Sequence, residues 1–285
     1  MERQAQIGLA HAFRRLHDRR QVLLLANAWD AGSARLLSQR GFAAIATTSA
    51  GVAWSLGYAD GERAPLAEVL AAIGRIARVL DVPLTADIET GYGETPAEVA
   101  ATVRAVIAAG AVGVNIEDGM PGHGPLRPVE AAAARLRAAR EAADASGVPI
   151  VINARVDSWM QRDDADASRR LADAIGRGRA YLAAGADCIY PIGLHERATL
   201  AALVQALDAP VNVNAGPGTP DLADLARLGV ARVSTATRLA TLALGAVERA
   251  ARAMLGSGRF DGLAADFTYA AAQRLFEPAA PRAAS

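Results

Sequence analysis

The feature that most constrains the fold is a pattern that occurs eight times along the chain. Each time, a short apolar run with β character is followed by an Ala- and Leu-rich segment with helical period. The apolar runs lie at 22–30, 43–51, 83–89, 113–118, 150–157, 188–194, 210–217 and 230–238. Apolar strands that alternate with helices indicate a parallel sheet covered by helices. Eight such units in 285 residues favour an α/β fold of the closed (β/α)8 TIM-barrel type over an open doubly wound sheet.

The domain organisation follows from the continuity of this series. No linker interrupts it, so residues 1–285 are predicted to form a single barrel domain. We expect an N-terminal helix within 1–20, an additional C-terminal helix over 257–277 and a disordered tail at 278–285. Because a barrel already has its eight helices, we expect the additional helix to be exchanged between subunits of a homo-oligomer.

Charge and residue usage exclude several classes of function. The formal net charge is zero and no basic run is interleaved with aromatic residues, so no nucleic-acid partner is expected. No apolar run reaches the length of a bilayer, so we predict no membrane association and a cytoplasmic location. All 30 basic residues are arginine, which excludes Schiff-base catalysis by lysine and a P-loop. The single cysteine, Cys188, excludes an internal disulfide and is expected to be a small buried hydrophobe.

Polar residues gather at the predicted carboxyl ends of the strands, where barrel enzymes place their reactive groups. They are Asp30, Thr48, Ser49, Asp87, Glu89, Glu117, Asp118, Asn153, Arg155, Asp157, Asn212, Asn214, Thr235, Thr237 and Arg238. Several carboxylates at one barrel mouth repel each other unless a cation neutralises them. Oxygen ligands without His or Cys select Mg²⁺, with Mn²⁺ as an alternative. Asp87 and Glu89 are therefore predicted to be held by a divalent metal.

Two further groups complete this hypothetical site. The guanidinium of Arg155 matches a substrate carboxylate in bidentate geometry. Backbone amides near Thr48, Ser49 and Ala50 can stabilise an oxyanion. A metal, a carboxylate-binding arginine and an oxyanion site together suit a 2-oxo acid, because the metal can stabilise its enolate.

Simpler interpretations remain open for the same residues. Asp87 and Glu89 can be a strand-end pair that faces solvent or pairs with arginine, and Arg155 can be a structural ion-pair partner. His123 lies in the Gly- and Pro-rich stretch GMPGHGPLRP, which fits either a lid or a solvated loop. His123, Tyr58 and a metal-bound water are the candidates for the proton donor to an enolate.

Five segments together resemble the isocitrate lyase / phosphoenolpyruvate mutase superfamily. They are ATTSAGVAWSLGYADGE, TADIETGYGE, GVNIEDG, INARVD and GADCIYPIGL, and the resemblance spans residues 20 to 245. It implies a (β/α)8 barrel whose last helix is exchanged within a homodimer or homotetramer. It also implies Mg²⁺ and a small 2-oxo or 2-hydroxy carboxylic acid at the mouth of the barrel.

The resemblance also assigns roles to individual residues. Asp87 resembles the metal-contacting aspartate, and Asp60, Glu89 and Glu117 resemble acids that hold the metal through water. Arg155 resembles the arginine that binds the substrate carboxylate. The catalytic candidates are Thr48, Ser49, Ala50, Arg155 and His123. The substrate-binding candidates are Trp29, Ser49, Ala50, Asp87, Arg155, Asn212 and Asn214.

Departures from the superfamily pattern narrow the predicted activity. The loop after Glu117 reads DGMPGHGPLRP and lacks the catalytic cysteine and the lysine of isocitrate and methylisocitrate lyases. Ile192 stands where those lyases have glutamate, and Glu89 stands where aspartate is common. The lysine, asparagine and serine of the phosphonopyruvate enzymes are also missing from this loop. The remaining branch includes oxaloacetate decarboxylases and uncharacterised 2-oxo-acid lyases.

The sequence thus predicts a Mg²⁺-dependent lyase that cleaves a carbon–carbon bond of a short 2-oxo or 2-hydroxy acid through a metal-stabilised enolate. Oxaloacetate decarboxylation is its simplest form, because loss of CO₂ yields pyruvate enolate without a general base. One alternative is hydrolysis or mutation of phosphonopyruvate. Another is a 2-oxo-acid-binding protein without catalytic activity.

Overall fold

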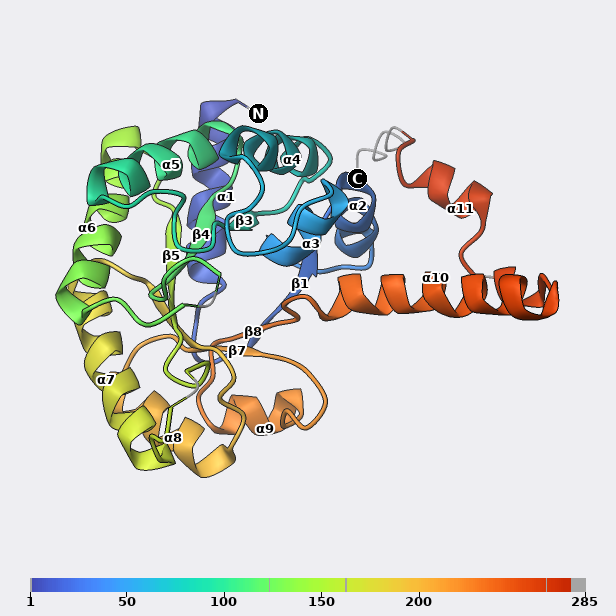
Figure 1. Cartoon of the computed structure of the whole chain (residues 1–285). Coiled ribbons are helices and arrows are strands. Elements are labelled where there is room, and N and C mark those ends of the chain that lie inside the picture. Colours follow the sequence, from blue (N-terminus) through green and yellow to red (C-terminus); the bar gives the residue numbers. More distant parts are fainter. Residues whose placement is uncertain (1, 123, 162, 265, 278–285) are drawn as a thin grey trace.

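The strands of the computed structural model form a parallel barrel (Figure 1). The structure describes residues 2–122, 124–161, 163–264 and 266–277. The strands are β1 Leu23–Ala28, β2 Ile45–Thr47, β3 Leu84–Asp87, β4 Gly113–Glu117, β5 Val151–Val156, β6 Cys188–Pro191, β7 Asn212–Asn214 and β8 Arg232–Ser234. They pair in the order β6-β5-β4-β3-β2-β1-β8-β7, and a parallel bridge between Ile189 and Val211 joins β6 to β7. The predicted (β/α)8 barrel is confirmed.

Helices surround the strands and close one end of the barrel. They are α1 Arg3–Arg15, α2 Ala31–Gln39, α3 Ser49–Ser55, α4 Leu66–Arg78, α5 Pro96–Ala108, α6 Val129–Ser146, α7 Ala167–Ala183, α8 Arg197–Leu207, α9 Leu222–Arg227, α10 Arg238–Ser257 and α11 Tyr269–Arg274. α1 inserts the buried Phe13 into the barrel floor, beside Gly113 of β4. A Cβ on Gly113 would lie 2.7 Å from Cε1 of Phe13, so only glycine leaves room for this plug.

Local sequence explains where several helices begin. α5 starts with a capping box, in which the Thr95 side chain accepts from the Glu98 backbone and the Glu98 side chain accepts from the Thr95 backbone. Pro96 occupies the first turn, where its missing N–H costs nothing. Asp30 and Ser33 form the same reciprocal pair at the start of α2.

The interior of the barrel is polar, in contrast to the Ala-, Val-, Leu- and Ile-rich layer between strands and helices. Alternate residues of a strand face the same side. Asp87, Asn115, Asn153 and Cys188 lie in register on β3 to β6 and face inward. Cys188 is a free, buried thiol, as expected, and burial raises its pKa to about 12.

The C-terminal part of the chain leaves the barrel. α10 projects away from it in Figure 1, and Ala240 is the only buried residue of this 20-residue helix. The continuous helix predicted over 257–277 is wrong in its bounds. α10 ends at Ser257 because Gly258 adopts the left-handed conformation at φ 66°, and a short 3₁₀ turn at Asp261–Leu263 precedes α11. The predicted tail at 278–285 lies outside the described residues.

None of the helices that the structure describes has the length and apolar character needed to span a bilayer.

Candidate active site

Acidic side chains from β3, β4 and the α3–α4 loop meet at the carboxyl ends of the strands. We call Asp60, Asp87, Glu89 and Glu117 the carboxylate cluster. Asp87 ends β3 and Glu117 ends β4, while Glu89 follows β3 by two residues. The backbone N–H of Glu117 donates to the carbonyl of Glu89 at 2.9 Å, which ties the ends of these two strands together. Asp60 comes from the connection between α3 and α4 and repels both Asp87 and Glu89.

The start of α3 faces Asp87. Thr48 caps the helix, and its hydroxyl accepts from the N–H of Gly51 at 3.5 Å. The N–H of Ser49 donates to Oδ2 of Asp87 at 3.3 Å. A Cβ on Gly51 would lie 2.8 Å from Cβ of Trp29, so glycine lets the helix start pass close to β1. The predicted oxyanion segment thus presents a backbone amide to the carboxylate cluster.

A hydrogen-bond network around Glu89 joins two loops. Oε2 of Glu89 accepts from the N–H of Glu62 at 2.6 Å, and Oε1 accepts from the hydroxyl of Tyr92 at 3.0 Å. Oε1 of Glu62 in turn accepts from the hydroxyl of Thr90 at 2.6 Å and from the N–H of Tyr92 at 3.0 Å. Glu62, Glu89 and Tyr92 all have positive φ, between 52° and 59°. Strained backbone of this kind is often found at functional sites.

The network uses residues that sequence reasoning missed. Glu62 and Tyr92 lie in loops, where strand periodicity gives no information on side-chain direction. The sequence signal that could have indicated them is TGYGE, in which an aromatic hydroxyl stands between two glycines directly after the acidic strand end.

Burial and mutual repulsion shift the pKa values of the cluster in one direction. Burial, followed by repulsion from Asp60 and Asp87, raises the pKa of Glu89 to about 7. Burial also raises the pKa of Asp87, although Arg155 opposes the shift. The pKa of Glu117 is raised well above its usual value, again mainly by burial. A nearby cation would lower all three, because it favours the ionised form.

Arg155 of β5 is fully engaged with acidic side chains. Its Nε and Nη2 donate to the two carboxylate oxygens of Asp157 at 2.6 and 2.7 Å, and its Nη1 forms an ion pair with Glu117. Because Arg155 and Asp157 are two residues apart on a strand, they face the same side of the sheet. The structural ion-pair interpretation of Arg155 is therefore realised in this structure. A substrate carboxylate would have to displace Glu117 or bind the outer edge of the guanidinium.

A second polar layer supports Asp157 and the loop after β4. Oδ1 of Asp118 accepts from the N–H of Asp157 at 2.9 Å, and its Oδ2 accepts from the hydroxyl of Tyr181 at 2.6 Å and from Nη1 of Arg177 at 3.1 Å. The same Nη1 donates to the carbonyl of Arg127 at 3.0 Å. This buried network fixes both ends, at Asp118 and Arg127, of the loop for which the sequence suggested either a lid or a solvated loop.

The loop between β4 and α6 touches the α3–α4 loop, which carries Asp60, at a pair of glycines. A Cβ on Gly61 would lie 2.8 Å from the Cα of Gly122. Gly61 has a φ of 94° and is buried. The two loops therefore meet backbone to backbone beside the carboxylate cluster.

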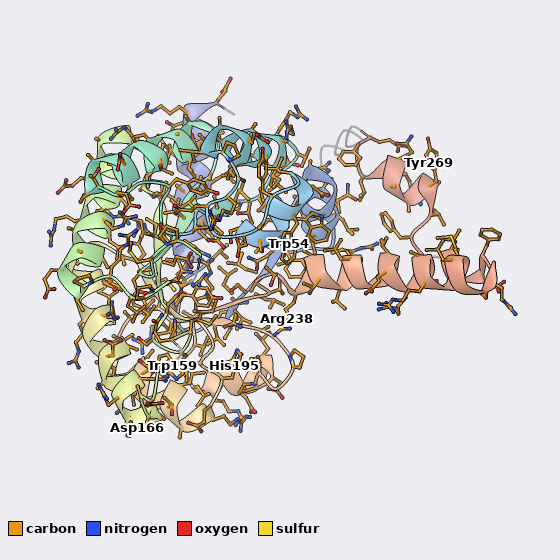
Figure 2. All side chains as sticks on the ribbon, viewed as in Figure 1. Trp54, Trp159, Asp166, His195, Arg238 and Tyr269 are labelled. Atoms are coloured by element: carbon orange, nitrogen blue, oxygen red, sulfur yellow. The ribbon has the colours of Figure 1, made fainter. Side chains whose placement is uncertain are left out.

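The other predicted site residues take different positions. Oδ1 of Asn214 accepts from the N–H of Gly193 at 3.2 Å, and the Asn214 carbonyl contacts Nε2 of His195 at 3.0 Å, which links the loops after β6 and β7. Asn212 is completely buried one layer deeper in the barrel, where its Nδ2 donates to Ser234 at 3.2 Å. Trp29 is half-buried beside the start of α3. Figure 2 shows Trp159 and His195 among the loops on the β5–β7 side of the molecule.

Two proton-donor candidates can also be placed. Tyr58 donates its hydroxyl to Glu68 at 2.9 Å, on the exposed side of the α3–α4 connection, so it is directed toward α4. His123 lies outside the described residues.

The donor set fits a divalent metal that is bound largely through water. Within the described ranges, no three Asp, Glu, His or Cys side chains are close enough together to ligate one ion directly. Carboxylates with raised pKa values, held by N–H and O–H donors around a common volume, instead suit an ion that keeps several of its waters, as Mg²⁺ does.

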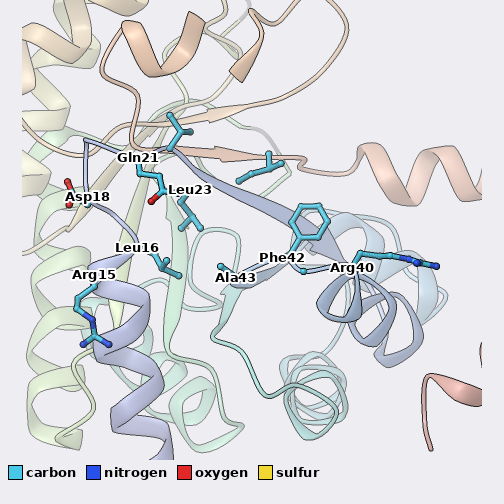
Figure 3. Close-up of a pocket in the computed structure, with 11 residues that line it drawn as sticks. Arg15, Leu16, Asp18, Gln21, Leu23, Arg40, Phe42 and Ala43 are labelled. Atoms are coloured by element: carbon cyan, nitrogen blue, oxygen red, sulfur yellow. The ribbon is translucent and has the colours of Figure 1, made fainter. Parts of the chain in front are cut away.

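A separate surface pocket lies at the opposite end of β1 (Figure 3). It has a volume of about 450 Å³ and is lined by the segment between α1 and β1 and by residues 40–43. Because barrel chemistry takes place at the carboxyl ends of the strands, we do not assign substrate binding to this pocket.

Comparison with known proteins identifies the family. The sequence pattern of the family described as phosphoenolpyruvate phosphomutase matches residues 13–255. The chain belongs to this family. It thereby falls in the isocitrate lyase / phosphoenolpyruvate mutase superfamily, as the resemblance indicated.

Individual relatives agree with this assignment. A crystal structure of a candidate lyase/mutase from Burkholderia cenocepacia J2315 is 40% identical, with a TM-score of 0.88 and 98% of each chain covered. The 2-methylisocitrate lyase of Escherichia coli is 33% identical over 71% of this chain and 68% of the relative. The oxaloacetate decarboxylase of Paraburkholderia xenovorans is 31% identical over 77% of this chain and 72% of the relative.

Proposed function

We propose that this member of the phosphoenolpyruvate phosphomutase family is a Mg²⁺-dependent lyase. It cleaves a carbon–carbon bond of a short 2-oxo or 2-hydroxy carboxylic acid by way of an enolate, and oxaloacetate decarboxylation is the simplest case. The observation that carries the proposal is the meeting of the carboxylate cluster, Arg155 and the amide of Ser49 at one barrel mouth. The likeness to an oxaloacetate decarboxylase supports the choice of substrate class.

The chain contributes three functions to this chemistry. Asp87 would bind Mg²⁺ directly, and Asp60, Glu89 and Glu117 would hold the ion through its water molecules. The bound ion would polarise the 2-oxo group and stabilise negative charge on its oxygen. The N–H groups at the start of α3 orient and stabilise that oxygen, and Arg155 binds the substrate carboxylate. The two loops that meet at Gly61 and Gly122 lie beside the cluster and would limit the access of water to it.

Bond cleavage in oxaloacetate needs no base on the protein. The carbon–carbon bond to the leaving carboxylate breaks, its electron pair passes into the enolate of pyruvate, and CO₂ departs. One proton then adds to carbon to give pyruvate. The first step fits a barrel mouth whose described polar groups are carboxylates, an arginine and backbone amides, and a metal-bound water is a candidate source of the proton in the second step.

The test follows pyruvate release from oxaloacetate in excess Mg²⁺, with the decarboxylation caused by free Mg²⁺ subtracted. We expect saturable turnover by the native chain and loss of it in Asp87→Ala. Asp81→Ala is the matched control, because Asp81 is an exposed carboxylate near the start of the same strand. It should retain native turnover.

Two outcomes would overturn the assignment. Native and Asp87→Ala rates that both equal the metal background would rule out oxaloacetate decarboxylation. Release of inorganic phosphate or formation of phosphoenolpyruvate from phosphonopyruvate would instead establish carbon–phosphorus chemistry.

We also propose that the chain forms a homodimer or homotetramer in which α10 is exchanged, in place of the additional helix that was expected over 257–277. α10 exposes Leu242, Leu244 and Val247 and buries almost none of its surface on its own barrel. Leu24, on the outward face of β1, is 39% exposed, where a barrel normally carries a covering helix. The exposed apolar side of α10 and the uncovered outer face of β1 are complementary, so α10 of one subunit can cover β1 of another.

Light scattering tests this assembly. The native protein should have two or four times the chain mass of 29.4 kDa. The mass of the double variant Leu242→Asp, Val247→Asp should shift toward that of the monomer. Arg252→Ala, on the polar side of α10, is the control. A native monomer would refute the exchange.

A further inference from the structure

A charged residue lies inside the barrel without a carboxylate partner among the residues that the structure describes. Arg232, on β8, is the largest of the fully buried side chains and has no solvent exposure. It lies in register with Leu23 of β1 and Asn212 of β7, so it points into the barrel, below the level of the carboxylate cluster. Neither the catalytic proposal nor the superfamily resemblance gives it a role.

The contacts of Arg232 compensate its charge only in part. Nη2 donates to Oδ1 of Asn115 at 3.3 Å, and the guanidinium carbon lies 5.9 Å from the centre of the Phe13 ring. Nε and Nη1 have no hydrogen-bond partner among the described residues, and no described acid forms an ion pair with this guanidinium. Burial lowers the pKa of Arg232, yet arginine keeps its proton in proteins. The positive charge is therefore permanent.

A purely structural role explains this residue poorly. Burying an incompletely paired ion costs several kcal/mol, whereas an apolar residue of similar volume is often neutral or stabilising. The Phe13 ring borders the guanidinium, and the buried Leu23 lies in register with Arg232 on the adjacent strand, so the surroundings accept apolar side chains. The charge of Arg232 is thus the property to be explained, rather than its volume.

Asn115 connects Arg232 to the carboxylate cluster. Its Oδ1 accepts from both Arg232 and Asn153, and Asn115 lies in register with Asp87 on the adjacent strand. Asn115 therefore lies between Arg232 and Asp87, the proposed metal-contacting carboxylate. The positive charge of Arg232 and the negative charge of Asp87 attract each other across the barrel interior. Solvent screens this attraction only in part, because Arg232 is fully buried and Asp87 is half-buried.

We propose that Arg232 is a positioning residue that supplies a fixed positive charge beneath the carboxylate cluster, where it weakens the hold on a divalent cation and strengthens the hold on an anionic ligand. This inference rests on the proposed metal site. During turnover, its positive charge reduces the repulsion between the ionised carboxylates and the negative charge that forms on the substrate. It acts through Asn115 and Asp87 and does not touch the substrate.

Two binding measurements with opposite expected signs test the proposal. Calorimetry first measures Mn²⁺ affinity, and then oxalate affinity at saturating Mn²⁺, for the native chain, Arg232→Met and Arg232→Lys. Arg232→Met should bind Mn²⁺ more tightly and oxalate more weakly, each by at least about tenfold, as expected for a unit charge that acts on a divalent ion roughly 10 Å away at an effective dielectric constant of about 50 or less. Arg232→Lys keeps the charge and should stay close to native in both.

The controls separate electrostatics from damage to the fold. Arg35→Met removes an arginine that contacts backbone carbonyls and Asp81 outside the barrel, and should change neither affinity. A distorted site would weaken both ligands, so paired losses in Arg232→Met, or two unchanged affinities, overturn the proposal. If Arg232→Met does not fold, Arg232→Gln provides the neutral variant. If neither folds, Arg232 is a structural residue and the proposal is wrong.

The same measurements distinguish this proposal from the proposed function. A native chain that binds no Mn²⁺ contradicts the metal site itself. A native chain that binds Mn²⁺ and oxalate, with no opposite shifts in Arg232→Met, contradicts only the role of Arg232.

Discussion

The contact between Gly61 and Gly122 gives a prediction with an internal control. Gly61 and Gly57 both lie in the segment that follows α3, with φ of 94° and 88°. An added Cβ on Gly57 meets nothing within 4 Å, whereas one on Gly61 meets the Cα of Gly122 at 2.8 Å. Alanine at either position therefore carries the same backbone strain, but only alanine at Gly61 also clashes with Gly122.

The expected magnitudes follow from these two terms. Alanine at either position should destabilise the fold by about 1–2 kcal/mol, because a side chain disfavours positive φ. Gly61→Ala should cost a further 1–3 kcal/mol or so, the usual cost of forcing an extra carbon into a packed contact. It should also displace Asp60 and Glu62, which flank it, whereas Gly57→Ala leaves them in place.

Thermal unfolding and Mn²⁺ titration check this reasoning together. Gly61→Ala should melt at least about 2 °C below Gly57→Ala, since 1 kcal/mol corresponds to roughly 2–4 °C for a large domain. Only Gly61→Ala should also lose Mn²⁺ affinity. Equal melting temperatures and equal affinities in the two variants would refute the claim that the loops pack against each other beside the cluster.

Two further predictions concern the buried polar groups. Because the pKa of Glu89 is raised from 4.5 to about 7 in the fold, its contribution to stability is fully present below pH 4.5 and is lost as the pH rises through 7. The melting temperature of the metal-free protein should fall between pH 5 and 8, and saturating Mg²⁺ should remove the decline; a flat metal-free profile would contradict the shift. Tyr181→Phe leaves Asp118 without its 2.6 Å donor and should destabilise the fold by about 1–3 kcal/mol in thermal unfolding. The control Tyr269→Phe, at an exposed tyrosine, should be neutral, and similar losses in both variants would contradict the importance of the Asp118 network.

The sequence predicted the barrel because each strand and helix carries its own local signal. Strand periodicity also located Asp87, Glu117 and Arg155, since alternate strand residues share a face. It does not account for Glu89, because β3 ends at Asp87 and Glu89 has a positive φ. The error after Ser257 has a local cause as well. Gly258 ends α10, but Gly256, Gly258 and Gly262 stand close together, and the sequence does not show which of them will adopt positive φ.

The parts that the sequence could not predict depend on loops and on pairings between distant segments. Asp60 was indicated only by resemblance, and Glu62 and Tyr92 were not indicated at all, because their side chains reach Glu89 through turns with positive φ. The pairing of Arg155 with Asp157 could have been expected from their spacing on a strand. Its competition with substrate for the same guanidinium could not, because that depends on Glu117 from the neighbouring strand.

At the proposed site, protons compete with the metal for the carboxylates, and Glu117 competes with the substrate for Arg155. Glu117 either pairs with Arg155 or turns toward a cation, and the raised pKa values of Glu89 and Asp87 mean that protons bind where a metal would otherwise bind. A cation that draws Glu117 away releases donors of Arg155 for a substrate carboxylate. Metal and substrate should therefore bind in a coupled way, each increasing the affinity for the other. In that coupling Asp157 keeps Arg155 in place while the other partner of Arg155 changes, since Asp157 accepts hydrogen bonds from Nε and Nη2 of Arg155.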